Sequence, residues 1–419
     1  MTIANLYKLY SQYYLVDTDT RKIRQNTLYF ALKGANFNGN TFAEEALKKG
    51  ALYSIVDEPN YVSSSKTILV DNVLETLQKL ASYHRRQLNL PILALTGSNG
   101  KTTTKELINA VLQKKYKTFS TQGNLNNHIG VPLTLLSMMP STEIGIVEMG
   151  ANHHKEIAFL CEIAQPNYGY ITNFGKAHLE GFGSVQGVIE AKSELYDHLI
   201  KTGGSIFINP KDPIQVEKTQ KAQTQEIDFS DIELLAANPF VKIRFHQLEI
   251  QTQLIGSYNF TNMAAALSIG HFFKVPDADC KAALESYTSE NNRSQIIKTA
   301  KNTIFLDAYN ANPTSMLAAI ENFNNYKAPH KIIILGDMFE LGVDSELEHQ
   351  KIVDLLEQLQ FENCYLIGNL FMKTKSHFTK LASIEELNAN LKTQVLTNHT
   401  FLIKGSRGMA LERIVPLIP

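Results

Sequence analysis

A phosphate-binding loop is the clearest chemical feature of the sequence. In LALTGSNGKTTTKEL, Gly97, Gly100, Lys101 and Thr102 lie between an apolar run and a helical pattern, the position that such a loop requires. Its backbone N–H groups would hold phosphate oxygens, the lysine would reach the β- and γ-phosphates, and the hydroxyl would bind Mg²⁺. The form is the shorter G-x-x-G-K-T, because Leu95 stands where a full Walker A motif has its first glycine. The alternative is a glycine turn with an exposed lysine.

Two later side chains are candidate magnesium ligands. Glu148 follows the apolar run IGIV, where a metal-binding carboxylate would lie opposite the loop. His178 lies in TNFGKAHLEGFGS, after the next strand pattern, and can coordinate through a neutral imidazole. The alternative for His178 is a structural, hydrogen-bonding histidine.

A lysine interrupts the apolar stripe of a predicted helix. The stripe consists of residues at three- and four-residue steps, Val185, Val188, Leu195 and Leu199. Lys192 falls on this stripe. Desolvation beside a nucleotide–metal site lowers the pKa of a lysine, which can then react with CO₂ to form a carbamate, an oxygen ligand for a second Mg²⁺. The alternative is a lysine that extends to solvent and pairs with Glu194.

Short apolar strands alternating with helices must position these residues. Residues 1–88 predict a small mixed α/β domain that ends in a helix with a basic cluster. Residues 89–285 predict a parallel sheet with both faces covered by helices. The same rhythm resumes over residues 286–419, which indicates a separate C-terminal α/β domain with its chemistry at the carboxyl ends of strands.

The composition indicates a cytoplasmic protein. Of 419 residues, 44% are hydrophobic and 19% charged, which is typical of a globular chain with more than one domain. The net charge of -1 gives no general attraction to nucleic acid or anionic lipid. The three cysteines form no C-x-x-C pair, which fits a reducing compartment. We expect no signal peptide and no membrane anchor, because no apolar run approaches the required length.

Together the motifs resemble those of the Mur ligase family, the ATP-dependent amide-bond ligases of bacterial cell-wall precursor synthesis. TGSNGKTTT, VEMGANHHKEI, TNFGKAHLEGFGS and EAKSEL occur in the family's order, and the likeness covers nearly the whole chain. TQGNLNNHIGVPLTLL, DAYNANPTSM, LGDMFELG and KGSRGMALE resemble the members that add D-alanyl-D-alanine to UDP-N-acetylmuramoyl-tripeptide. The resemblance implies an α/β fold of three domains: a UDP-muramoyl-binding domain, a P-loop ATPase-like central domain and a Rossmann-like C-terminal ligase domain.

The resemblance also implies roles for individual residues. The implied ATP contacts are Gly97, Asn99, Gly100, Lys101, Thr102, Thr103, Asn262, Arg293, Asp307 and Asn310. The implied ligands of two Mg²⁺ are Thr102, Glu148, His178 and carbamylated Lys192, and these with Lys101 would carry catalysis. The implied contacts to the UDP-muramoyl substrate are Thr20, Arg21, Asn126 and Asn127.

Some of these positions depart from the family pattern. Asn262 matches a residue facing adenine, but Tyr258 stands where the family often has histidine. Arg293 matches a phosphate-contacting arginine, but Asn292 replaces the usual preceding glycine. Asp307 matches a ribose-contacting acid, with the neighbouring asparagine loop near the reaction centre. The alternative for the asparagines is turn formation or helix capping.

The implied reaction makes an amide in two steps. The substrate carboxylate would take the γ-phosphoryl group of ATP to form an acyl phosphate, and the amine of D-alanyl-D-alanine would displace phosphate. We expect small-molecule substrates, no nucleic-acid or membrane partner, and a monomer. The alternatives are a ligase that adds the third stem amino acid or glutamate to folate, a nucleotide-dependent switch or motor, and a UDP-sugar-binding module with a vestigial phosphate loop.

Overall fold

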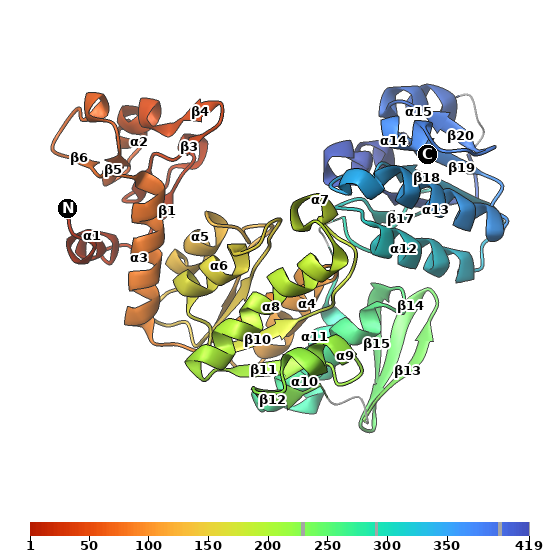
Figure 1. Cartoon of the computed structure of the whole chain (residues 1–419), viewed down its shortest axis with the longest axis horizontal. Helices are drawn as coiled ribbons and strands as arrows, with labels where there is room; N and C mark the ends of the chain where they lie inside the picture. The colour runs from red at the N-terminus through yellow and green to blue at the C-terminus, as the bar shows by residue number, and fades with distance from the viewer. Residues whose placement is uncertain (228–230, 290–291, 393–395, 419) are drawn as a thin grey trace.

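The chain folds into three α/β units, each built on its own sheet (Figure 1). The structure is a computed structural model that describes residues 1–227, 231–289, 292–392 and 396–418. The N-terminal and C-terminal units lie on opposite sides of the central unit (Figure 1). Within these described ranges, no helix is long and apolar enough to cross a membrane.

The N-terminal unit is a four-stranded sheet with short helices. Its strand order is β1-β2-β5-β6, all parallel. Its elements are α1 (Ile3–Tyr10), β1 (Val16–Asp17), β2 (Leu28–Phe30), β3 (Lys33–Gly34), β4 (Phe37–Asn38), α2 (Ala43–Lys48), β5 (Tyr53–Val56), β6 (Thr67–Leu69) and α3 (Val73–Leu88). The long helix α3 runs from this sheet to the central unit (Figure 1), against which it packs through α5 and α6.

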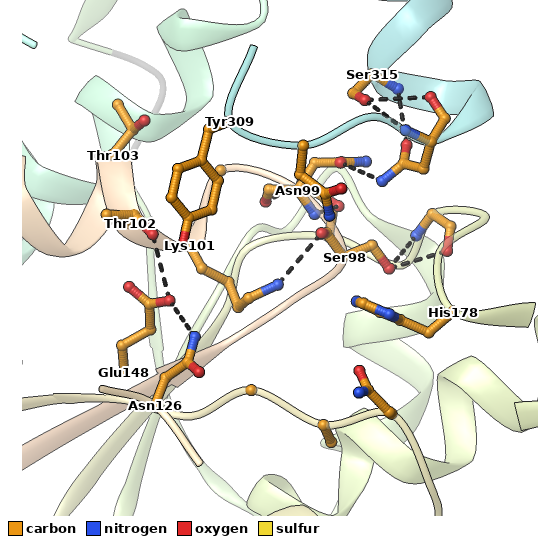
Figure 2. Close-up of a pocket in the computed structure, with 18 of the residues that line it drawn as sticks. Ser98, Asn99, Lys101, Thr102, Thr103, Asn126, Glu148, His178, Tyr309 and Ser315 are labelled. Carbon is orange, nitrogen blue, oxygen red and sulfur yellow. Dashed lines mark hydrogen bonds between the residues drawn. The ribbon is translucent and has the colours of Figure 1, made fainter. Parts of the chain in front are cut away.

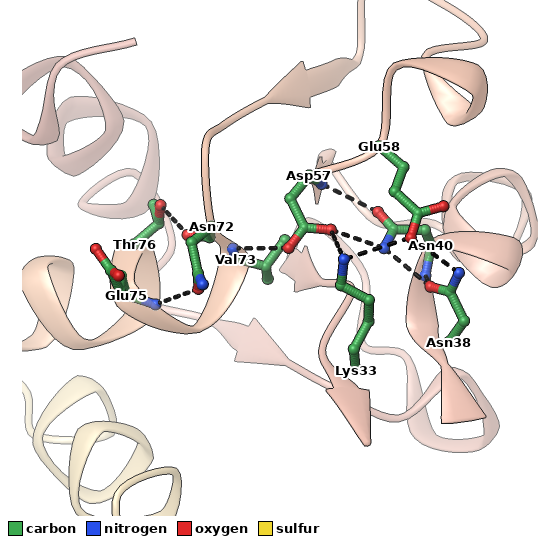
Figure 3. Close-up of polar contacts among 9 residues, drawn as sticks. All are labelled: Lys33, Asn38, Asn40, Asp57, Glu58, Asn72, Val73, Glu75 and Thr76. Atoms are coloured by element: carbon green, nitrogen blue, oxygen red, sulfur yellow. Dashed lines mark hydrogen bonds and ion pairs between the residues drawn. The ribbon is translucent and has the colours of Figure 1, made fainter. Parts of the chain in front are cut away.

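A polar cluster fixes the start of α3 to the N-terminal sheet (Figure 3). The carboxylate of Asp57, just after β5, accepts a hydrogen bond from the backbone N–H of Val73 at 3.3 Å and from the amide of Asn40 at 2.9 Å. The ammonium of Lys33 lies 3.0 Å from the same carboxylate. Because Asn72 also caps the helix, α3 begins at a fixed point.

The central unit is a six-stranded parallel sheet between two layers of helices. Its order is β12-β11-β10-β7-β9-β8. The strands are β7 (Ile92–Thr96), β8 (Thr118–Ser120), β9 (Ile144–Glu148), β10 (Tyr168–Ile171), β11 (Ser205–Ile208) and β12 (Gln223–Glu226). The helices are α4 (Lys101–Leu112), α5 (Gly130–Leu136), α6 (Glu156–Ala164), α7 (Leu179–Phe182), α8 (Val185–Thr202), α9 (Pro213–Lys218), α10 (Asn259–Phe272) and α11 (Asp277–Ser286). All residues of β7 and β9 are buried, as expected for strands covered on both faces.

Two features of the central unit differ from the sequence prediction. The strands β13 (Ile232–Ala237), β14 (Phe240–Phe245) and β15 (Leu248–Ile255) form a separate antiparallel sheet that the strand–helix rhythm did not predict. On α8, Val188, Lys192, Leu195 and Leu199 are buried as predicted. Val185 is 40% exposed, so its placement on the buried stripe is wrong. It is the first residue of the helix, next to the N-cap Ser184, so no preceding helical turn packs beside it.

The C-terminal unit is a six-stranded sheet of order β16-β17-β21-β18-β19-β20, parallel except for the edge strand β16. Its strands are β16 (Gln295–Lys298), β17 (Thr303–Asp307), β18 (Lys331–Gly336), β19 (Cys364–Ile367), β20 (Thr379–Leu381) and β21 (Thr400–Lys404). Its helices are α12 (Pro313–Asn325), α13 (Ser345–Gln358), α14 (Asn369–Met372) and α15 (Ile384–Leu391). The last strand lies between two earlier ones. The domain boundaries after residues 88 and 285 stay predictions.

Candidate active site

A cavity of about 990 Å³ lies where the central and C-terminal units meet. Its lining includes the phosphate loop and the carboxyl ends of β9 and β10 from the central unit, and residues after β17 and β21 from the C-terminal unit. It extends to Leu74 and Gln78 of α3. Carboxyl ends of parallel strands are the usual location of ligand sites in α/β proteins.

The phosphate loop joins β7 to α4 in a shape that needs its glycines. Gly97 and Gly100 have φ angles of 147° and 78°. A Cβ added at Gly97 would lie 1.9 Å from the hydroxyl oxygen of Thr172. That hydroxyl donates to the carbonyl of Asn99 at 2.6 Å, and the amide of Asn173 donates to the same carbonyl at 2.9 Å. The end of β10 therefore holds the loop in place.

Lys101 lies at the centre of the site (Figure 2). Its ammonium donates to the backbone carbonyls of Gly97, at 2.6 Å, and Ser98, at 3.3 Å. Burial lowers the pKa of Lys101 to about 8; the Glu148 carboxylate opposes this effect and Arg293 adds to it. An anionic ligand in the cavity would favour the protonated form.

Thr102 and Glu148 lie in contact at the start of α4. The Thr102 hydroxyl donates to one carboxylate oxygen of Glu148 at 3.3 Å, and the amide of Asn126 donates to the same oxygen at 2.8 Å (Figure 2). The other carboxylate oxygen is buried and has no hydrogen-bond donor. An orphaned anionic oxygen next to a phosphate loop fits a hard divalent cation such as Mg²⁺. Among the described residues, no group of three or more His, Cys, Asp and Glu could hold a metal by itself.

His178 reaches the cavity from the loop before α7. Its Nδ1 is hydrogen-bonded to the carboxylate of Glu340 from the C-terminal unit. This bond lowers the pKa of Glu340. When the carboxylate accepts the proton of Nδ1, the other ring nitrogen carries a free lone pair, which is how metal-binding histidines are usually oriented. His178 therefore fits a cation ligand, although its partner lies about 160 residues further along the chain.

Lys192 is buried behind the wall of the cavity, and is not part of its lining. Its side chain is 1% exposed, and its ammonium lies 5.6 Å from the centre of the Phe182 ring. Burial lowers the pKa of Lys192 well below its ordinary value, and the charge of Lys101 makes a smaller contribution in the same direction. Glu194 accepts two backbone hydrogen bonds at the start of α6 instead. The alternative of a solvent-exposed lysine paired with Glu194 is therefore wrong.

The C-terminal unit supplies a cation and an aromatic ring to the cavity. The guanidinium carbon of Arg293 lies 3.6 Å from the centre of the Tyr309 ring. The Nε of Arg293 is buried without a hydrogen-bond partner. Tyr309 lines the same cavity as Thr102 and Lys101 (Figure 2). The guanidinium is therefore stacked on Tyr309, acts on Lys101 of the phosphate loop through its charge, and has one N–H without an acceptor.

The asparagines after β17 connect the two units. Asn312 caps α12, and its amide donates to the side-chain oxygen of Asn99 in the phosphate loop at 2.7 Å. Asn310 also lines the cavity, and its carbonyl accepts a hydrogen bond from Lys404. Asp307 lines the cavity, and its contact with a ribose stays a prediction. The side chain of Asn312 therefore caps α12 and also contacts the phosphate loop.

Asn262 packs against the phosphate loop. A Cβ added at Gly100 would lie 2.8 Å from its side-chain oxygen, which accepts a hydrogen bond from Thr104 at 3.1 Å. Thr103 and Tyr258 line the same cavity, and burial raises the pKa of Tyr258. The contact of Asn262 with adenine stays a prediction.

The predicted substrate contacts fall into two groups. Asn126 and Asn127 both line the cavity, although the side-chain oxygen of Asn127 also accepts two backbone hydrogen bonds at the start of α5. Thr20 and Arg21 lie in the N-terminal unit, outside the cavity. The side chain of Arg21 is 85% exposed and forms an ion pair with Asp19. Their contact with a nucleotide stays a prediction.

The cavity residues that sequence reasoning did not single out include Tyr309, Ser294 and Lys404. Tyr309 lies inside the quoted DAYNANPTSM stretch, and Lys404 ends a predicted strand, so each had a positional signal. Ser294 is a short polar residue in a connecting segment and has no such signal.

Matches to known proteins extend along nearly the whole chain and point to one family. Residues 12–92, 95–270 and 292–407 match the Mur ligase family catalytic domain, the Mur ligase middle domain and the Mur ligase glutamate ligase domain. The UDP-N-acetylmuramoyl-tripeptide–D-alanyl-D-alanine ligase of Bacillus subtilis (strain 168) is 34% identical over 99% of this chain and 95% of its own. The ligase of the same name from Escherichia coli (strain K12) is 32% identical over 96% of this chain and 92% of its own.

Solved structures show the same three-domain α/β fold. A crystal structure of MurF from Acinetobacter baumannii superimposes with a TM-score of 0.84 and 29% identity, over 96% of this chain and 92% of the other. The structure of the MurF ligase of Thermotoga maritima in complex with ADP superimposes with a TM-score of 0.83 and is 26% identical in sequence, over 96% of each chain. The predicted fold class is confirmed, and the chain belongs to the Mur ligase family.

Proposed function

We propose that the protein is an ATP-dependent ligase that joins D-alanyl-D-alanine to UDP-N-acetylmuramoyl-tripeptide, giving the UDP-muramoyl-pentapeptide precursor of peptidoglycan, ADP and phosphate. The observation that carries this proposal is the cavity between two units, in which an intact phosphate loop meets Arg293 and Asp307. Full-length relatives named for this reaction support the choice of substrates. A cytoplasmic location and a monomeric state stay predictions.

The first step must bring two anions together, because a carboxylate attacks the γ-phosphorus of ATP. Lys101 and Arg293 supply positive charge at the phosphate loop, where a water-poor site strengthens its effect. The backbone N–H groups at the start of α4 add the partial positive charge of a helix N-terminus. Thr102 and Glu148 would hold one Mg²⁺, which when bound neutralises phosphate charge.

Lys192, as a carbamate, and His178 would hold a second Mg²⁺, which when bound would neutralise further negative charge. We infer that the neutral amine of Lys192 adds to CO₂, forming an N–C bond and releasing one proton, to give a carbamate. The lowered pKa of Lys192 and the absence of a carboxylate partner among the described residues support this inference. The free ring nitrogen of His178 would complete the pair of ligands.

The second step needs a site without competing water, since water would hydrolyse the acyl phosphate. Contacts across the interface support such an enclosure. The amide of Asn312 donates to Asn99, and the Lys176 ammonium donates to the Glu348 carboxylate at 2.9 Å. Residues of the C-terminal unit would complete the nucleotide site when the units close on their substrates.

The test is ADP release by the purified protein. We expect release to require both UDP-N-acetylmuramoyl-tripeptide and D-alanyl-D-alanine, and to fall by about 100-fold or more in Lys101→Met, because an electrostatic contact to the transferred phosphoryl group is lost. Release with single amino acids in place of the dipeptide would instead indicate a different Mur ligase. Release without any amine acceptor would indicate a nucleotide-dependent switch or motor.

A further inference from the structure

Lys404 is a buried cation in the cavity that the proposed reaction does not use. It ends β21, and the sheet register pairs it with Asp307 at the end of β17. Its side chain is 2% exposed, and its ammonium lies 2.5 Å from Oδ2 of Asp307. The same ammonium donates to the carbonyl of Asn310 at 3.1 Å. All three residues line the cavity.

The carboxylate of Asp307 is held from two sides. Lys404 binds one oxygen, and the backbone N–H of Ser294 donates to the other at 3.2 Å. The Ser294 hydroxyl is itself hydrogen-bonded to the phenol oxygen of Tyr258 in the central unit at 2.8 Å. An ionised carboxylate has about four acceptor positions, so two donors fix its plane and leave capacity for further donors from the cavity. Asp307 keeps 18% of its side chain exposed.

Burying an ion pair is costly, and a pair of apolar residues would often stabilise a fold as well or better. The Lys404–Asp307 pair therefore needs a reason beyond stability. The geometry of the pair suggests one: both residues line the cavity, Asp307 is the more exposed of the two, and Lys404 fixes both Asp307 and the loop at Asn310.

We propose that Lys404 is a positioning residue for the nucleotide. It orients Asp307 to accept hydrogen bonds from the ribose hydroxyls, and it balances the charge of Asp307 in a cavity that must admit polyphosphate. The inference rests on the proposed function, which takes ATP as the nucleotide and Asp307 as the acid near the ribose.

The test is equilibrium binding of ADP, 2′-deoxy-ADP and 3′-deoxy-ADP, each with Mg²⁺, to the full-length protein by calorimetry. A hydrogen bond to a charged acceptor makes the wild type bind ADP about tenfold or more tightly than at least one deoxy analogue. In Lys404→Met we expect the affinity for ADP to fall to about the affinity that the wild type has for the deoxy analogue. The preference for ADP over that analogue should then be below about threefold. Lys404→Arg, which can still donate to Asp307, should restore part of the preference.

Lys331→Met is the matched control, because Lys331 lies in the same sheet at the amino end of β18 and donates to the carbonyl of Asn324, outside the cavity. Equal loss of affinity for ADP and both analogues in Lys404→Met would overturn the inference and leave a merely structural lysine. Absence of any ribose preference in the wild type would overturn it as well.

Two further measurements keep the outcomes separate. If Lys404→Met does not fold, the double variant Lys404→Met/Asp307→Asn removes both charges, and a preserved ribose preference in that variant would contradict the inference. Failure of the proposed function has a different signature: wild-type protein that binds ADP with a ribose preference but forms no product from D-alanyl-D-alanine.

Discussion

Burial is the property that separates Lys192 from an ordinary helix lysine. It lies on a helix whose other lysine, Lys201, is exposed. Its ammonium is removed from water, and the charge of Lys101 acts on it as well. Burial and the charge of Lys101 both favour the neutral amine, which is the form that reacts with CO₂.

Lys192→Ala should lower ligase activity by about 100-fold, because the site would lack an anionic ligand near the transferred group. Short-chain carboxylates should restore part of the activity, since a carboxylate can occupy the space of the missing carbamate. The measurement is the rate of ADP release with and without added acetate or propionate. Lys201→Ala should change neither quantity.

A second readout does not depend on turnover. Protein equilibrated with ¹³CO₂ should show a carbamate carbon signal in the wild type and in Lys201→Ala, but not in Lys192→Ala. A wild type without that signal would remove the carbamate from the proposal, even if Lys192→Ala is inactive.

At the scale of elements, α3 connects the N-terminal unit to the central unit through a buried histidine. His84 is fully buried on α3; one ring nitrogen lies 3.3 Å from the phenol oxygen of Tyr7 on α1, and the other lies 2.9 Å from the carbonyl of Met138 after α5. Burial lowers the pKa of His84 below its ordinary value of 6.5. Protonation would place an unpaired charge where three helices meet.

The pH dependence of stability follows from that shift. The folded state keeps His84 neutral, whereas the unfolded chain takes up a proton below pH 6.5, so stability is present above that pH and is lost as the pH falls toward the folded-state pKa. For one group, the free energy of unfolding can change by at most about 1.4 kcal/mol per pH unit. We expect the unfolding temperature to decline from pH 6.5 to 5, and less so in His84→Gln.

His153→Gln is the control for this prediction, because His153 is a mostly exposed histidine of the central unit. The unfolding temperature of His153→Gln should decline with falling pH as much as that of the wild type. An equally steep decline in His84→Gln would assign the acid sensitivity to other groups, among them the buried His349, whose pKa is also lowered by burial.

At the scale of the whole molecule, the loop that holds His178 is one of the contacts between the central and C-terminal units. Lys176 pairs with Glu348 of α13, and Glu348 also pairs with Lys351. The backbone N–H of Glu180 donates to the carbonyl of Glu340 at 3.1 Å. The loop that holds His178 and the position of the C-terminal unit are therefore coupled, as the contact of α7 with the C-terminal unit in Figure 1 also indicates.

Glu348→Gln should weaken this contact without stranding a buried charge, because both lysine partners are about half exposed. A partly exposed pair is worth about 1 kcal/mol or less, so a few-fold change is expected. We predict faster hydrogen exchange of the Glu180 amide and a few-fold higher KM for ATP. Glu357→Gln, on the outer part of α13, should leave both unchanged. Unaltered exchange in Glu348→Gln would show that the pair does not hold the units together.

The sequence by itself determined the local chemistry of this protein. A phosphate loop is specified within a few residues, because Gly97 and Gly100 must adopt positive φ angles and the following helix begins at Lys101. The alternation of strands and helices likewise predicted which strand ends carry Glu148 and Asp307. Helix periodicity placed Lys192 on the buried stripe of α8, but it could not say how deeply the side chain is buried.

Only the tertiary structure decided which distant residues share the site. Lys404 meets Asp307 because the last strand inserts between β17 and β18, an order that no local pattern contains. Glu340 reaches His178 because two units are docked, and Glu194 turns from Lys192 to the start of α6 because those helices pack together. Strand order, docking and side-chain burial depend on contacts between segments far apart in the chain, whereas loop and helix signals depend on neighbours.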